Sequence, residues 1–108
     1  MTTKENILKA LSAKTFIPYE INGTPCTLRV WSGTDMDIWE KHNKENEDDT
    51  RALFCSLTIG DENGNKLFSK SDIAELGKVD FRLLDKIIED GLKLNKVSND
   101  DIRVAEKN

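Results

Sequence analysis

The stretch from Asp61 to Asn95 constrains the fold most, because it places a turn, a short helix, a glycine stop and a long amphipathic helix within about a third of the chain. The turn falls at Asp61–Asn65, where Gly and Asn tolerate the positive φ angles that other residues resist. Ser69 has the character of an N-cap, with Asp72 three residues on as in a capping box, and Gly77 is placed to end this short helix.

A longer helix is predicted to begin after Val79-Asp80, since apolar residues then recur at steps of three and four. They define one helical face, which we expect to be core: Phe81, Leu84, Ile87, Ile88, Gly91 and Leu92. Three apolar pairs have the spacing of a hydrophobic staple, namely Phe68 with Ile73, Val79 with Leu84, and Val97 with Ile102. This spacing predicts short helices that begin at set angles to the preceding chain.

The N-terminal residues predict a short helix within 1–14, capped by Thr2 or Thr3. Its inner face carries Ile7, Leu8 and Leu11, while the other residues are polar, so this helix must dock or fray.

Residues 15–31 predict a two-stranded β-hairpin about Asn22-Gly23, the pair preferred in a type I′ turn. The expected register sets Ile21 opposite Thr24, Tyr19 opposite Cys26, Ile17 opposite Leu28 and Thr15 opposite Val30, which gathers apolar side chains on one face. In this register both prolines, Pro18 and Pro25, take non-hydrogen-bonded positions, and each discourages a third strand from pairing there.

After the hairpin, Thr34 and Asp37 resemble a capping box for a helix that carries Trp39 as a core anchor and His42 as an ordinary helical residue. The polar run 45–49 is expected to supply the next N-cap. Residues 50–59 fit two patterns, because apolar residues alternate as in a strand and also suit a buried helix. The length and the acidic start favour the helix.

With 108 residues, the chain is expected to form a single domain, 1–108. Its parts are an N-terminal helix (1–14), the hairpin (15–31) and a helical region (34–108). The predicted fold class is therefore mainly α, of the α+β type, with about four to five short helices after the hairpin. The sequence contains neither a secretory segment nor an apolar run of about 20 residues, which predicts no membrane partner. Cys26 and Cys55 are expected to be free thiols in a reducing cytoplasm.

The sequence favours neither an enzyme nor a nucleic-acid binder. It has no phosphate-binding loop, no Cys-x-x-Cys pair, no His-Glu-x-x-His motif and no nucleophile elbow, and His42 is its single histidine, so we expect no catalytic residues, cofactor or metal. The net charge is −4, with 16 basic residues dispersed among 20 acidic ones. The predicted helix 80–92 offers only Arg82 and Lys86 for phosphate contacts, which predicts no nucleic-acid partner.

A calcium-binding loop is a minor alternative for the turn region. Oxygen-bearing residues stand at positions one, three, five, nine and twelve of an EF-hand-sized loop: Asp61, Asn63, Asn65, Ser69 and Asp72. The sixth position requires Gly for a sharp turn, yet it holds Lys66, while Gly64 comes two residues early. Position twelve is Asp rather than the longer Glu, so a plain turn and N-cap is the expected structure.

The order of these parts resembles one known family. The features that carry the likeness are the hairpin, the Trp-bearing helix, the apolar helix, the Asp-x-Asn-Gly turn, Leu67-Phe68-Ser69 with Asp72-Ile73 and Leu76, Leu83-Leu84 with Ile87-Ile88, Leu92-x-Leu94-Asn95, Val97-Ser98 and Glu106-Lys107-Asn108. In this order the chain resembles the tail assembly chaperones of long-tailed bacteriophages and prophages.

The resemblance implies a non-enzymatic protein of the host bacterial cytoplasm, absent from the mature virion, that binds and solubilises the tape-measure protein. It also implies homo-oligomers and a longer, frameshifted product that recruits the tail-tube protein. A small phage or bacterial regulatory adaptor, antitoxin-like or transcription-linked, is the alternative, because an acidic helical composition suits it equally. By exclusion, we nominate three residues for a partner surface: Leu83 and Leu94, which lie off the main helical stripe, and Trp31, at the junction after the hairpin. The alternative is that all three complete a small core.

Overall fold

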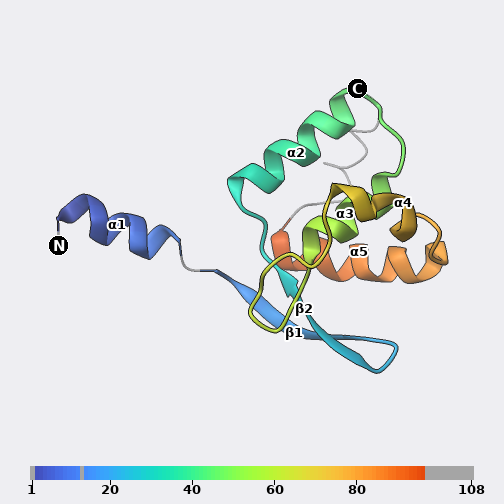
Figure 1. The fold of residues 1–108 in the computed structure, drawn as a ribbon, viewed down its shortest axis with the longest axis horizontal. Coiled ribbons are helices and arrows are strands. Elements are labelled where there is room, and N and C mark those ends of the chain that lie inside the picture. Colours follow the sequence, from blue (N-terminus) through green and yellow to red (C-terminus); the bar gives the residue numbers. More distant parts are fainter. Residues whose placement is uncertain (1, 13, 97–108) are drawn as a thin grey trace.

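The computed structural model describes residues 2–12 and 14–96. Over these residues the elements are α1 (Thr3–Leu11), β1 (Phe16–Ile21), β2 (Thr24–Arg29), α2 (Gly33–Lys44), α3 (Thr50–Thr58), β3 (Ile59–Gly60), the 3₁₀ helix η1 (Lys70–Asp72), α4 (Ile73–Leu76) and α5 (Phe81–Asn95). The fold is mixed α+β and mainly helical, as the sequence predicts. The helices α2 to α5 gather at one end of the hairpin, while α1 projects away from them (Figure 1).

The hairpin has the predicted register. Ile21 faces Thr24, Tyr19 faces Cys26 and Ile17 faces Leu28, and the prolines fall opposite Thr27 and Glu20. A third strand, β3, pairs with β2 at Thr27 and Leu28, beyond Pro25, so the sheet has three strands in the order β1-β2-β3. The predicted hairpin is confirmed, but it is one part of a larger sheet.

Residues 50–58 form a helix, which confirms the preferred interpretation of the ambiguous stretch. The ambiguity has a physical cause, because every residue from Ala52 to Gly60 is buried. A segment covered on all sides needs no polar face, so its apolar residues need not follow one period. The chain then changes from α3 to β3 without a loop.

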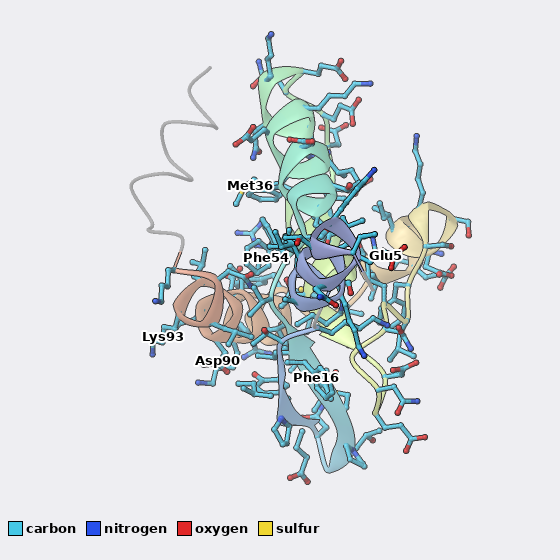
Figure 2. The ribbon with its side chains drawn as sticks, turned by 90° about the vertical axis from the view of Figure 1, so that its left-hand side faces the viewer. Glu5, Phe16, Met36, Phe54, Asp90 and Lys93 are labelled. Atoms are coloured by element: carbon cyan, nitrogen blue, oxygen red, sulfur yellow. The ribbon has the colours of Figure 1, made fainter. Side chains whose placement is uncertain are left out.

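Two buried clusters lie on either side of α3. One contains Trp31, Trp39 and Phe54 with Leu53, Leu57 and Leu92, and the other contains Leu28, Cys55, Ile59, Leu84 and Ile87. Phe54 is fully buried and lies among the helices in Figure 2. Its ring centroid is 4.9 Å from that of Trp31 and 5.5 Å from that of Trp39, within the range of favourable aromatic pairs. The prediction that Trp39 anchors the core is confirmed.

The α5 stripe packs as predicted from Leu84 onward. Leu84, Ile87, Gly91 and Leu92 are buried, and Ile88 is half-buried. Phe81 is 60% exposed, so its predicted place in the core is wrong. It is the first residue of α5, about one turn before the contact between the Leu84 carbonyl and the Cys55 thiol on α3.

The first helix forms as predicted but does not dock. Thr2 and Glu5 form a reciprocal capping box, yet no residue of α1 is buried. Ile7, Leu8 and Leu11 are 53%, 54% and 75% exposed, which contradicts their expected place on an inner face.

The second helix begins earlier than predicted. The Asp35 amide donates to Ser32 Oγ at 3.1 Å, and the Ser32 amide donates to Asp35 Oδ2 at 3.0 Å, so Ser32 and Asp35 form the capping box expected of Thr34 and Asp37. Ser32 is the residue with the extended backbone that a cap needs. Asp49 does hold the N-cap position of α3, but with left-handed backbone angles and no side-chain capping bond.

The turn at 61–65 is confirmed. Gly64 has a φ of +77°, and a Cβ there would overlap the ring of Phe16, so both conformation and space require glycine. The Ser69 amide donates to Asp72 at 2.8 Å, and Gly77 follows α4 as its C-cap with right-handed helical angles. The predicted staple Val97–Ile102 and the segment Glu106-Lys107-Asn108 lie outside the described residues.

Candidate partner-binding cleft

An open cleft of about 550 Å³ lies between α2, α3 and the segment 66–73. Its apolar lining comes from all three of these parts: Ile38, Leu53, Leu57, Phe68 and Ile73. Polar and charged residues complete it: Lys41, His42, Glu45, Glu47, Ser56, Lys66, Ser69 and Lys70. An apolar floor within a ring of mixed charge is suited to the apolar face of an amphipathic helix.

Helix geometry explains how the apolar side chains reach the cleft. Trp39 points into the core, and its neighbour Ile38, one residue back along the helix, is therefore turned about 100° from it and is 40% exposed. Leu53 and Leu57 are four residues apart and share one face of α3. Both also belong to the aromatic cluster, so the floor of the cleft is the outer side of the core.

The wall at 66–73 is fixed to the rest of the protein by a buried carboxylate. Lys66 Nζ lies 2.8 Å from Asp35 Oδ1, and Asp35 is 1% exposed. Arg29 Nη1 lies 3.4 Å from the other oxygen of the same carboxylate and donates to the Leu57 carbonyl at 2.6 Å. This network joins β2, α2, α3 and the wall of the cleft.

The charge of Asp35 is maintained by these partners. Burial raises the pKa of the Asp35 carboxyl, but the hydrogen bonds from Lys66 and from the Ser32 amide, with the positive charges of Lys66 and Arg29, outweigh burial and hold the pKa below its usual value. The carboxylate therefore stays ionised at neutral pH.

His42 lies at the edge of the cleft, where neighbouring side chains hold its ring. Its ring stacks on Trp39 with an interplanar angle of 6°, its Nε2 lies 3.3 Å from Thr50 Oγ1, and its Nδ1 lies 3.3 Å from Glu47 Oε2. It is a residue of α2, as predicted.

In the turn that resembles a calcium loop, the carboxylate at the first position, Asp61, binds backbone amides of the turn itself. Asp61 Oδ1 accepts from the backbone amides of Asn65 and Asn63 at 3.0 and 2.8 Å, and these bonds hold the pKa of Asp61 below its usual value. Within residues 2–12 and 14–96, no three His, Cys, Asp or Glu side chains gather where they could hold a metal ion. Over the same residues, no helix is both long and apolar enough to cross a membrane.

The three residues nominated as a partner surface lie away from this cleft. Trp31 is 8% exposed, and its Nε1 donates to Thr58 Oγ1 at 3.0 Å within the core. Leu83 and Leu94 are half-buried and pack against the second core cluster. The structure places all three in or against the core and does not test their binding role.

Sequence reasoning missed the cleft because its parts are far apart along the chain. One local signal was present: Ile38 is apolar at a position beside Trp39, off the core face of its helix. Phe68 and Ile73 complete the cleft because the chain folds back toward α2 and α3 after β3. The periodicity of single elements does not indicate this long-range contact.

Together the fold and the cleft define a small, mainly helical α+β protein with an apolar groove on one side. Its fold is similar to the solved structure of the bacteriophage HK97 tail assembly chaperone, with a TM-score of 0.60 over 90% of this chain and 100% of that one. The two sequences are 14% identical, so the likeness is one of fold. No protein-family model and no curated protein matches the sequence.

Proposed function

We propose that this protein is a phage tail assembly chaperone that binds and solubilises the tape-measure protein through the apolar cleft. The observation that carries the proposal is the fold shared with the HK97 tail assembly chaperone over 90% of the chain. The order of turns and apolar positions supports the same class from the sequence.

The cleft fits such a client physically. A long helical client exposes apolar residues at steps of three and four, and an apolar groove buries such a stripe by helix-in-groove recognition. Burial contributes roughly 25 cal/mol per Å² of apolar area, so one short groove binds weakly. Many copies bound along one client polymer then hold it through avidity.

The proposed role is non-enzymatic and belongs to the host bacterial cytoplasm rather than to the mature virion. Partnership with the tail-tube protein, through a longer frameshifted product, is part of the same proposal. These expectations follow from the family resemblance and depend on the chaperone role.

The test is co-expression with the tape-measure protein encoded beside this gene. The wild-type chain should raise the soluble fraction of the client and co-purify with it. Ile38→Glu and Phe68→Glu, which place a charge in the cleft, should reduce co-purification at least tenfold. Phe81→Glu is the matched control for Ile38→Glu, because both residues are exposed and apolar but Phe81 lies outside the cleft. A wild-type chain that neither solubilises nor binds the client contradicts the proposed function.

A second outcome would place the binding surface on another element. If both cleft variants bind normally while Leu83→Glu or Leu94→Glu releases the client without lowering the melting temperature, the partner surface is the flank of α5. Trp31 is unsuited to this test, because a charge at a buried aromatic residue is expected to unfold the protein.

A further inference from the structure

The charged residues of the cleft are unevenly placed along its length. Lys66 is bonded to Asp35 at the start of α2, whereas Glu45 and Glu47 line the cleft where α2 ends. The helical rise from Asp35 to Glu45 is about 15 Å, which is the length of three turns of a helix. The cleft therefore has a basic end, at Lys66, and an acidic end, at Glu45 and Glu47.

The wall opposite α2 runs between the same two ends. It begins at Lys66 and leads through α4 to Gly77, where an added Cβ would lie 3.3 Å from Asp49 Oδ1. Asp49 is the N-cap of α3 and lies at the acidic end. Lys70 lines the cleft from the middle of this wall, and Lys41 lines it from α2. Two lysines, one on each wall, thus flank the central part of the cleft.

These charges are available to a partner. Among residues 2–12 and 14–96, no side chain forms an ion pair with Glu45 or with either of the two central lysines. At the basic end, Lys66 and Arg29 share the single carboxylate of Asp35, which leaves one positive charge in excess. A partner with the complementary pattern of charge would neutralise both ends and the centre.

We propose that the cleft binds a client helix whose apolar stripe is flanked on both sides by acidic residues and ends beside a basic residue. The acidic residues lie next to Lys41 and Lys70 in the centre and next to Lys66 at the basic end. The basic residue lies next to Glu45 and Glu47. This inference rests on the proposed function, and it adds to that function a class of client segment and one direction of binding.

Charge, rather than the apolar floor, sets this direction. A stripe of apolar side chains fits the floor almost equally well in either direction, so the floor contributes affinity but little orientation. The cleft lysines and glutamates are exposed, and each exposed ion pair contributes little. In the reversed direction, however, like charges meet at both ends of the cleft, and this repulsion selects against that direction.

The experiment titrates two synthetic helical peptides into the full chain by calorimetry. Both peptides are about 14 residues long, or four turns, with blocked termini and the same stripe of leucines. The first has glutamates on both sides of the stripe and lysines at its C-terminal end, and the second has these charges exchanged. The first should bind about tenfold more tightly at low salt. The difference should shrink at about 0.5 M salt, where exposed charges are screened.

Variants of the cleft separate recognition of charge from the helicity of the peptides. The double variant Lys41→Glu/Lys70→Glu should reverse the preference between the two peptides, which a difference in peptide helicity cannot do. Lys4→Glu/Lys9→Glu is the matched control, because it changes the net charge equally on α1, outside the cleft. All four lysines are exposed, so both double variants should keep the wild-type melting temperature.

Broadening of amide signals by a nitroxide on the first peptide measures the direction. A label at its lysine end should broaden the amide signals of 45–47 more than that of Lys66, and a label at its glutamate end should do the reverse. Equal affinities of the two peptides for the wild type, an unchanged preference of the cleft variant, or equal broadening at both ends would each overturn the inference. Those results would leave the proposed function standing, with a cleft that binds helices regardless of charge.

Absence of binding by either peptide would overturn the inference as well. Co-expression with the whole tape-measure protein then decides the proposed function by itself, so the failure of one proposal is distinguishable from the failure of the other.

Discussion

At the scale of single residues, Asp35 links more parts of the candidate site than its position in one helix suggests. It accepts the Ser32 amide in the capping box of α2, pairs with Lys66 at the wall of the cleft and contacts Arg29 from β2. A carboxylate that is 1% exposed is tolerated only because these groups satisfy it. Asp35, a member of the capping box of α2, thereby also fixes the wall of the cleft.

We expect Asp35→Asn to lower the free energy of unfolding at neutral pH by about 2 kcal/mol, because it removes the buried charge that the half-buried Arg29 and the more exposed Lys66 both contact. The folded pKa of Asp35 lies below its unfolded value, so its contribution is present above about pH 4 and is lost as pH falls through the folded pKa. Urea unfolding at pH 7 and pH 3 should therefore show a smaller acid-induced loss for the variant than for wild type. Asp37→Asn, an exposed position on the same helix, is the control and should behave like wild type.

The two thiols should differ in reactivity. Burial, followed by the charge of Asp85, raises the pKa of Cys55 to about 12, and its side chain is fully buried. Burial also raises the pKa of Cys26, but Cys26 is only half-buried. In native buffer at pH 8, mass spectrometry should detect alkylation of the Cys55→Ser variant well before that of the Cys26→Ser variant. Rapid native labelling of Cys26→Ser would show that the α3–α5 contact opens locally.

At the scale of elements, a close approach between α3 and α5 explains the one glycine inside the long helix. A Cβ at Gly91 would lie 2.8 Å from Phe54 Cε1 and 2.9 Å from Thr58 Cγ2, and both side chains are fully buried. Gly91 thus fits the predicted stripe through its lack of a side chain rather than through apolar burial. The sequence indicates its face but not its neighbour.

We expect Gly91→Ala to lower the free energy of unfolding by about 1–2 kcal/mol, because overpacking costs more than the gain of up to about 1 kcal/mol in helix propensity. The matched control is Gly33→Ala at the start of α2, where an added Cβ meets nothing within 4 Å. Thermal unfolding should show a lower midpoint for the first variant and an equal or higher one for the second. Equal midpoints for Gly91→Ala and wild type would mean that α5 shifts freely along α3.

The elements show where sequence reasoning succeeds and where it ends. The register of the hairpin, the helix at 50–58 and the buried stripe from Leu84 follow from short-range patterns in the sequence. Phe81 and the face of α1 were wrongly assigned to the core. Apolar periodicity identifies an apolar face of a helix, but it does not show that another element packs against that face. The strand β3 was missed because two residues are too few to set a period.

At the scale of the whole molecule, the candidate cleft was beyond sequence reasoning because three separate segments build it. The residues that exclusion nominated, Trp31, Leu83 and Leu94, were chosen one element at a time, and tertiary packing gave them core contacts. The fold class itself was predictable, since the local patterns of the hairpin, of α3 and of α5 from Leu84 onward agree with the observed architecture. Sites formed between elements require the arrangement that only the structure supplies.

At the same scale, the client proposed for the cleft gives a prediction that separates the cleft from the exposed first helix. Ile38→Glu places a charge in the cleft and should lose binding of a soluble tape-measure fragment, whereas Leu11→Glu on α1, outside the cleft, should bind the fragment as well as wild type. Light scattering of the chain during titration with the fragment measures both effects. If Leu11→Glu instead loses client binding, α1 contributes to the client surface itself.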